Sequence, residues 1–284
     1  MTGFSRAFSN QADGGSRNGN ALLSIARHLF PIRWIGRRYA RALCLAAILF
    51  GIGQAPAQAQ CEEANWENAP YSICTFTAGK SDIRIFLDDP DGAVFGSFSA
   101  VSEALARQGE KLVFAMNAGM YHPDFRPVGL YIEGGVEKAK LNTRNGPGNF
   151  HLKPNGVFYV TKTGAGVVES DKFGPRRSDA RYATQSGPML VINGRIHPRI
   201  NEEGTSKKTR NGVGACSGGR IVFAISNEPV TFYEFATLFR DKLGCSDALF
   251  LDGSISSLYA PSIGRHDRWR PMGPIIGVVE KGKP

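Results

Sequence analysis

The segment 248–257 constrains the fold most, because an apolar run there stops at an acidic residue and a glycine. Ala248 to Leu251 has the composition of a short buried strand, whereas Asp252-Gly253 is typical of a strand's end. Glycine also allows the tight turn that follows such a strand. We therefore predict a carboxylate at the carboxyl end of a strand, followed by small hydroxyl side chains. The hydroxyl residues are Ser254, Ser256 and Ser257.

A helix is predicted directly before this strand. Thr231 and Glu234 have the spacing of a capping box, in which two side chains bond to backbone amides at the start of a helix. Apolar residues then fall on one helical face up to Leu243, and Gly244 is a typical residue at the end of a helix. The order is therefore helix, glycine, strand and acidic turn.

The same order occurs once before in the chain. Residues 99–107 have the pattern of a helix, Gly109 ends it, residues 112–116 form an apolar strand, and Asn117 follows. Each of the two units thus delivers one polar residue to the end of a strand. We predict that Asn117 and Asp252 line one cleft.

Most other periodic segments predict strands, and short glycine-rich connections separate them. Two dipeptides, Gly134-Gly135 and Asn193-Gly194, are typical of hairpin turns. We predict an α/β fold of the mixed α+β kind: one domain after a signal peptide, with a mixed or mostly antiparallel sheet and flanking helices. The remaining predicted strands lie at 73–77, 83–87, 128–133, 150–158, 189–192, 220–225 and 275–279.

Residues 1–59 begin with a polar segment, 1–20, whose composition predicts disorder, and the remainder has the features of an export signal. Arginines precede the apolar run 43–52, which is short for a membrane span, and Ala57-Gln-Ala59 is a small-x-small cleavage site. We predict a disordered leader and signal peptide at 1–59, one domain at 60–284, a periplasmic or secreted location, and membrane contact only through the leader. An uncleaved membrane anchor is the alternative.

The positive charge of the chain belongs mostly to this leader. The whole chain has a formal charge of +9, from 34 Lys and Arg against 25 Asp and Glu. Residues 1–59 hold seven of the basic residues and one of the acidic ones, which leaves 27 against 24, a charge of +3. Without a basic run or a nucleic-acid motif in the remainder, we predict no nucleic-acid partner.

The cysteines agree with export. Four remain after the leader, an even number that suits disulfides in an oxidising compartment. We favour the pairs Cys61–Cys74 and Cys216–Cys245 among the three possible pairings. A zinc site is the rival hypothesis, but no Cys-x-x-Cys pair is present, and we predict neither a metal nor another cofactor.

Two regions carry candidates for anion binding. Arg210 precedes a glycine-rich turn, and the loop 142–149 is rich in Gly and Asn and contains Arg144. For each residue taken singly, a surface turn or a structural ion pair is the alternative. The segment after the loop adds His151, Lys153 and Asn155.

Several of these motifs together resemble one protein family. They are Asn117–Tyr121, Gly187-Pro188 with Asn193-Gly194, Thr209-Arg210 before Gly212 and Gly214, Leu251–Ser257, and Gly148–Gly156. From about 83 to 279 the chain resembles the phosphodiester glycosidase family, whose best-known member is the lysosomal uncovering enzyme. The last motif resembles a bacterial subfamily. Ala118 and Ser254 stand where the family commonly has glycine, which leaves the identity of the substrate open.

The resemblance implies hydrolysis of a sugar-1-phosphodiester in an envelope or exopolysaccharide glycan. Asp252 would act at the anomeric carbon as nucleophile or base, and Arg210, with Arg144 or Lys153, would clamp the phosphate. His151 and, less directly, His122 would transfer protons. The residues expected to bind substrate are Asn117, Arg144, Lys153, Asn155, Arg210, Gly253, Ser254 and Ser256.

Other hypotheses stay open at this stage. The candidates for a second catalytic carboxylate are Asp124, Glu133 and Glu228. A non-catalytic periplasmic binder of anionic glycans would use the same arginine, asparagine and serine groups, although it would gain nothing from Asp252. A metal-dependent hydrolase would need histidines at ligand spacing, and those after the leader are scattered.

Overall fold

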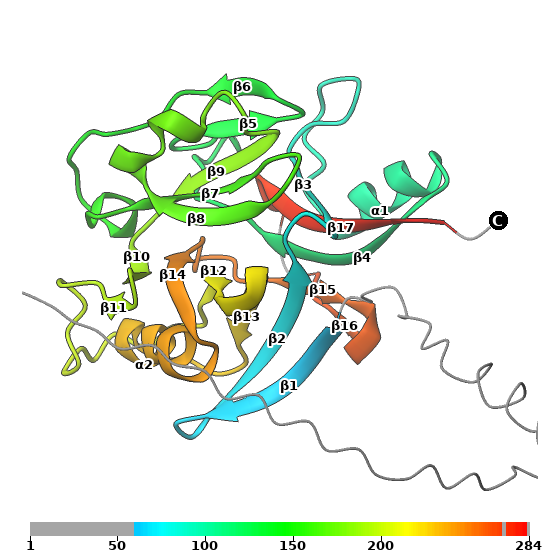
Figure 1. The fold of residues 1–284 in the computed structure, drawn as a ribbon. Coiled ribbons are helices and arrows are strands. Elements are labelled where there is room, and N and C mark those ends of the chain that lie inside the picture. Colours follow the sequence, from blue (N-terminus) through cyan, green and yellow to red (C-terminus); the bar gives the residue numbers. More distant parts are fainter. Residues whose placement is uncertain (1–59, 269–270, 283–284) are drawn as a thin grey trace, which may run out of the picture. The chain divides into compact units, whose positions relative to one another are not determined.

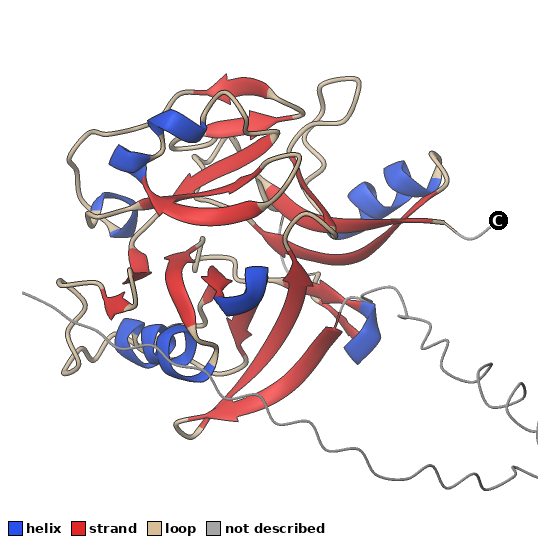
Figure 2. Cartoon of the chain, in the orientation of Figure 1, coloured by secondary structure: helices blue, strands red, loops and turns tan. Residues whose placement is uncertain are grey.

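The computed structural model describes residues 60–268 and 271–282, and strands dominate them (Figure 2). Every pairing between named strands is antiparallel, which confirms a mostly antiparallel architecture with few helices. The predicted leader lies outside the described residues. Within the described ranges, no helix combines the length and apolar character needed to cross a membrane.

Three sheets form the fold (Figure 1). The seven-stranded sheet has the order β1 (Gln60–Trp66), β2 (Ala69–Thr77), β13 (Arg220–Ser226), β12 (Asn211–Cys216), β14 (Cys245–Phe250), β10 (Met189–Ile192), β11 (Arg195–Ile196). The second sheet has the order β16 (Arg265–His266), β15 (Leu258–Ala260), β4 (Glu110–Asn117), β17 (Ile275–Lys281), β3 (Asp82–Phe86). The third has the order β6 (Val136–Ala139), β5 (Tyr131–Glu133), β9 (Tyr182–Ser186), β7 (Gly156–Val160), β8 (Ala165–Glu169).

Both predicted helices are present. Helix α1 (Phe98–Ala106) begins after Ser97, whose side chain accepts from the Ala100 amide. Helix α2 (Phe232–Thr237) begins with the predicted capping box and continues as a π-helical turn (Leu238–Lys242). The 3-10 turns are η1 (Asn149–His151), η2 (Ser170–Lys172), η3 (Gly174–Arg176), η4 (Ser217–Gly219) and η6 (Pro261–Ile263).

Two predicted strands differ from the structure in extent. The segment 150–158 begins with the 3-10 turn at 149–151, and β7 starts only at Gly156. The segment 128–133 becomes a strand only from Tyr131, because residues 121–127 form a turn of their own. The described residues contain seventeen strands, whereas the sequence predicted nine. Strands as short as β11 and β16 carry too little alternation of side chains to be recognised.

Aromatic rings join the three sheets into one core. Phe223 of β13 packs against Phe114 of β4 and Phe158 of β7, with ring centroids 4.8 and 5.7 Å apart. All three side chains are fully buried. Burying a phenylalanine contributes about 1.5 to 3 kcal/mol. This junction therefore holds the three sheets together.

Two disulfides join neighbouring strands, with the favoured pairing. Cys61 and Cys74 lie opposite each other on β1 and β2. Cys216 and Cys245 link β12 to β14. The second bridge matters for the site, because the opposite ends of β12 and β14 carry its polar residues.

Candidate active site

Three strand ends meet where the sequence placed its acidic turn. Strand β14 ends just before Asp252, β12 begins at Asn211, and β4 of a different sheet ends at Asn117. Because β12 and β14 are antiparallel, the start of one lies beside the end of the other. The Asn117 amide nitrogen donates to the backbone oxygen of Asp252 at 2.8 Å. The structure thus brings Asn117 and Asp252 together.

Asn117, Asn211, Asp252, Ser256 and Ser257 form one hydrogen-bonded group, which we call the strand-end cluster. The oxygen of the Asn117 side chain accepts from Asn211 Nδ2 at 3.0 Å and from the Ser257 amide at 2.9 Å. The oxygen of the Asn211 side chain accepts from the Ser256 hydroxyl at 3.2 Å. Asn117 is 1% exposed and Asn211 is fully buried. A buried, satisfied network of this kind holds its members rigidly.

The carboxylate of Asp252 is almost buried, with only 8% of the residue exposed. Its Oδ1 accepts from the Ser254 amide at 2.9 Å, and no ion pair in 60–268 or 271–282 includes it. Burial raises the pKa of Asp252 because it disfavours the charged form, and the bonds to Ser254 oppose this rise. A carboxyl with a raised pKa, held in place, suits proton transfer or attack on carbon.

Gly253 is needed for the tight turn after Asp252. A Cβ there would lie 2.6 Å from Cζ of Phe250, too close for any side chain. The turn can therefore pack onto the end of β14. The Gly253–Ser257 segment forms part of the wall of a cleft of about 580 Å³. The other wall residues are Lys208, Thr209, Ser226, Asn227, Arg265 and Asp267.

Arg210 occupies a more enclosed position than its predicted role suggests. It is 2% exposed, and its guanidinium donates to the backbone oxygens of Val230 at 2.9 Å and Ser206 at 2.8 Å. The guanidinium carbon lies 3.6 Å from the ring centroid of Phe232. Burial lowers the pKa of Arg210 to about 10, so it remains charged at neutral pH. Arg210 precedes Asn211 in the sequence, but its guanidinium packs on Phe232 and bonds to backbone oxygens, and it shares no hydrogen bond with the strand-end cluster.

The other predicted anion binders lie in a loop that bonds mainly to itself. In this 142–155 loop, Nδ1 of His151 lies 3.1 Å from the Arg144 carbonyl, and Lys153 Nζ donates to the Thr143 carbonyl at 2.5 Å. Asn155 is buried and donates to the Phe150 carbonyl at 2.9 Å. The structure therefore groups these candidates with one another. None of them shares a hydrogen bond with Asp252.

The candidate second carboxylates are all engaged elsewhere or exposed. Asp124 pairs with Arg126 at 2.6 Å, and Glu133 pairs with Lys138 at 2.6 Å. Glu228 is exposed. None of the three shares an ion pair or hydrogen bond with Asp252.

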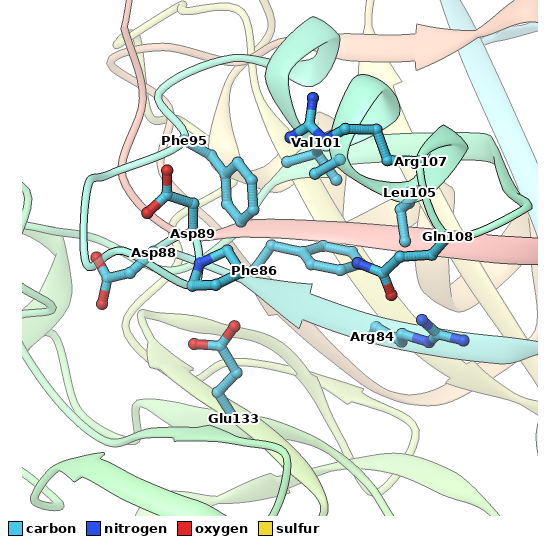
Figure 3. A pocket seen from close by; sticks show the side chains of 12 residues that line it. Arg84, Phe86, Asp88, Asp89, Phe95, Val101, Leu105, Arg107, Gln108 and Glu133 are labelled. Atoms are coloured by element: carbon cyan, nitrogen blue, oxygen red, sulfur yellow. The ribbon is translucent and has the colours of Figure 1, made fainter.

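A second pocket, of about 430 Å³, lies between β3 and α1 (Figure 3). Phe86 and Phe95 meet there edge to face, with centroids 6.3 Å apart. Its charged walls have partners within the protein, since Arg84 bonds to Glu110 at 2.7 Å and Glu133 bonds to Lys138. No member of the strand-end cluster lines this pocket.

Sequence reasoning missed two residues of the site. The buried amide of Asn211 bonds to both oxygens of Asn117. Tyr121 lies four residues after Asn117. Burial raises the pKa of its hydroxyl, and the charge of Asp252 raises it further. Asn211 directly follows Arg210, and Tyr121 ends the motif Asn117–Tyr121, so the sequence carried a signal for both. Within the described ranges, no three His, Cys, Asp or Glu residues gather as a metal site would require.

Comparisons with known proteins place the chain in context. A family model described as phosphodiester glycosidase matches residues 110–279. A relative in Escherichia coli (strain K12), named uncharacterized protein YigE, is 39% identical over 202 residues, which cover 70% of this chain and 78% of the relative. The catalytic domain of zebrafish N-acetylglucosamine-1-phosphodiester alpha-N-acetylglucosaminidase, auto-inhibited by its pro-peptide, is similar in fold. Its TM-score is 0.53 at 12% identity, with 80% of this chain and 84% of that one covered.

Proposed function

Because this chain belongs to the phosphodiester glycosidase family, we propose that it hydrolyses the glycosidic bond of a sugar-1-phosphodiester, with Asp252 acting at the anomeric carbon. The observation that carries this proposal is the nearly buried carboxylate of Asp252 at the meeting of three strand ends. Its pKa is raised by burial, and backbone and amide bonds hold its position. The substrate class follows from the family and from the polar cleft beside it.

In the proposed reaction, the bond between the anomeric carbon and the phosphate oxygen breaks. Its electron pair leaves with the phosphate monoester, and the oxygen of water bonds to the carbon. The phosphate monoester is a good leaving group, so stabilising the positively charged sugar matters more than protonating the leaving oxygen. Asp252 supplies a negative charge beside that carbon and either accepts the proton of water or forms a transient ester that water then hydrolyses.

The surrounding residues take different roles in this proposal. The amide of Asn117 is bonded within the strand-end cluster, so we assign it to holding the strand ends. Ser254 and Ser256 belong to the cleft wall and offer hydroxyls to sugar or phosphate. Arg210 supplies fixed positive charge, Arg144 or Lys153 supports the phosphate, and Gly253 and Asn155 shape the approach. His151 remains the candidate for proton transfer.

Export fits the same proposal. Two disulfides favour an oxidising compartment, which supports a non-cytoplasmic protein. We therefore place the enzyme in the periplasm or outside the cell, acting on an envelope or exopolysaccharide glycan after its leader has directed export. Cell fractionation of the tagged protein tests this placement, and retention of activity in the cytoplasmic fraction alone would contradict it.

The activity test uses a panel of methyl phosphodiesters of hexose-1-phosphates and N-acetylhexosamine-1-phosphates. Purified protein should release reducing sugar and methyl phosphate. In ¹⁸O water, methyl phosphate should form without ¹⁸O, because the carbon–oxygen bond breaks. Label in the phosphate product would mean attack at phosphorus and would contradict the proposal. Binding without release would favour a non-catalytic glycan binder.

The matched variants are Asp252→Asn and Asp247→Asn. Both replace a carboxylate by its amide near the same strand, and Asp247 bonds to the Asn193 amide at 3.1 Å on the far side of β14. Release by the wild type and the Asp247 variant, but not by the Asp252 variant, is the expected result. Release by all three would move the catalytic role to another residue.

A further inference from the structure

The segment 120–128 forms a tight turn that carries two aromatic rings, Tyr121 and Phe125. The Val128 amide donates to the Met120 carbonyl at 3.0 Å, which closes the base of the turn. The His122 amide donates to the Arg126 carbonyl at 2.8 Å. Within this turn the rings of Tyr121 and Phe125 are stacked, with centroids 5.8 Å apart and planes inclined by 27°.

Phe125 adopts a backbone conformation that its side chain disfavours. Its φ is +65°, in the left-handed region that bulky side chains rarely occupy. Such a conformation costs about 1 to 3 kcal/mol and persists where the surrounding structure enforces it, often at ligand sites. The Phe125 amide donates to the His122 carbonyl at 2.8 Å, which fixes the conformation.

Core packing does not account for the ring of Phe125. Neither Phe125 nor Tyr121 belongs to any of the four hydrophobic clusters in the described part of the chain. Both residues are partly exposed. A strained backbone that carries a phenylalanine outside the core is unexpected for stability alone, because glycine or asparagine would fit the same φ.

Tyr121 lies close to Asp252, and Phe125 stacks on Tyr121. The Asp252 amide donates to the Ala118 carbonyl at 3.3 Å, and Tyr121 follows three residues later. The Tyr121 ring packs onto Gly273, where a Cβ would lie 2.6 Å from the ring. Its hydroxyl lies 3.4 Å from the Pro271 carbonyl. The ring is therefore held from two sides, and the charge of Asp252 reaches its hydroxyl.

We propose that Tyr121 and Phe125 form a stacking platform for the sugar ring whose anomeric carbon faces Asp252, an inference that rests on the proposed function. The C–H groups on one face of a pyranose are weakly positive and apolar, which complements the negative face of an aromatic ring. A rigid platform orients the sugar with a smaller entropic cost at binding, because the protein side chains are already ordered. The sugar's polar edge is then left to the hydroxyls of Ser254 and Ser256.

Two variants of Phe125 distinguish the effect of its aromatic ring from the effect of its strained backbone. Phe125→Tyr keeps the ring, whereas Phe125→Leu keeps apolar bulk and the same unfavourable φ but removes the ring. Loss of one stacking contact should raise KM, and the Kd of the product sugar, about tenfold in the leucine variant. The tyrosine variant should resemble the wild type in both. Equal Tm values in the three proteins show that any change is not loss of folding.

Four outcomes decide between the two proposals. Hydrolysis with KM raised in the leucine variant alone supports both. Hydrolysis with the same KM in all three proteins overturns the platform and leaves the proposed function standing. Sugar binding that depends on the ring, without hydrolysis of any phosphodiester in the panel, overturns the function and supports the platform. Neither binding nor hydrolysis by the wild type overturns both.

Discussion

The strand-end cluster and the 142–155 loop are both rich in polar side chains, but they are held in opposite ways. In the cluster, the hydrogen bonds of Asn117 reach partners 94, 135 and 140 residues away in sequence. In the loop, the bonds of His151, Lys153 and Asn155 reach partners 7, 10 and 5 residues away. The cluster depends on the packing of whole sheets. In the loop, these three side chains bond within their own segment, although Asn142 ties the start of the loop to Gln185 of β9.

This difference predicts different functional effects. A group fixed by several strands keeps its geometry while charge develops in a reaction, so its residues should control kcat and stability together. A locally bonded loop with exposed cations contributes mainly to attraction of an anion, so its residues should control KM. Variants in the two groups therefore test whether the division is real.

The largest effect is expected for Asp252→Asn, which should lower kcat about a thousandfold, as loss of a catalytic base or nucleophile does. The Asp247→Asn protein is the control, and steady-state kinetics on the same phosphodiester are the measurement. A rise in KM with unchanged kcat would instead assign Asp252 to substrate binding. The functional contrast between the cluster and the loop would then be lost.

The same substitution should raise thermal stability at neutral pH. Burial raises the pKa of Asp252 in the folded protein above that of the unfolded chain, so the unfolded chain loses its proton first as pH increases. Ionisation therefore costs stability above the folded pKa, and this cost is absent below the usual aspartate pKa of about 4. The Tm advantage of Asp252→Asn should shrink as pH falls through this window. A constant difference would argue against a raised pKa.

The two disulfides provide a second contrast, because only one joins strands of the cluster. Cys216 and Cys245 are 29 residues apart in the sequence. Replacing both by serine should lower the free energy of unfolding by roughly 3.5 kcal/mol, because the unfolded chain gains loop entropy. Cys61 and Cys74 are 13 residues apart, so replacing both should lower the free energy of unfolding by about 3 kcal/mol. Urea unfolding measures both. Only the first pair of substitutions should also reduce kcat, since β12 and β14 carry Asn211 and Asp252.

Asn211→Ala tests the amide network directly. It removes the donor to Asn117 and the acceptor for Ser256 and should destabilise the protein by about 2 to 3 kcal/mol. Because Asn117 holds the backbone of Asp252, kcat should fall as well. Asn211→Asp preserves one acceptor but loses the donor, so it should recover little activity. Full activity in a stable Asn211→Ala protein would show that the network is not needed to place the carboxylate.

The sequence predicted those parts of this fold and site that local patterns determine. The capping box of α2, the hairpin at Asn193-Gly194 and the carboxylate after a strand all depend on a few adjacent residues, and all are present. The two helix–strand units do bring Asn117 to Asp252, but both are buried, and neither lines the cleft beside Gly253–Ser257, so their sharing of one cleft stays a prediction. The family follows from motifs as well and is confirmed by the match over 110–279.

The remainder depends on contacts that no local pattern encodes. Asn211 joins the cluster because β12 lies beside β14, a pairing that its neighbouring residues do not specify. The burial of Arg210 against Phe232 depends on how α2 packs over the sheet, so a glycine-rich turn beside an arginine could not reveal it. The φ of Phe125 is invisible in sequence, because nothing about phenylalanine suggests a left-handed conformation.

The smallest effects are expected in the loop, for Arg144→Gln and Lys153→Gln. Both remove a positive charge from a segment without an ion pair in the described part of the chain, so Tm should change little. If either side chain attracts the substrate's phosphate, KM should rise several-fold, roughly the effect of one exposed charge pair, with kcat preserved. Added salt should reduce this difference by screening. A loss of kcat comparable to that of Asn211→Ala would mean that the loop shares the chemistry, and the cluster would no longer account for turnover alone.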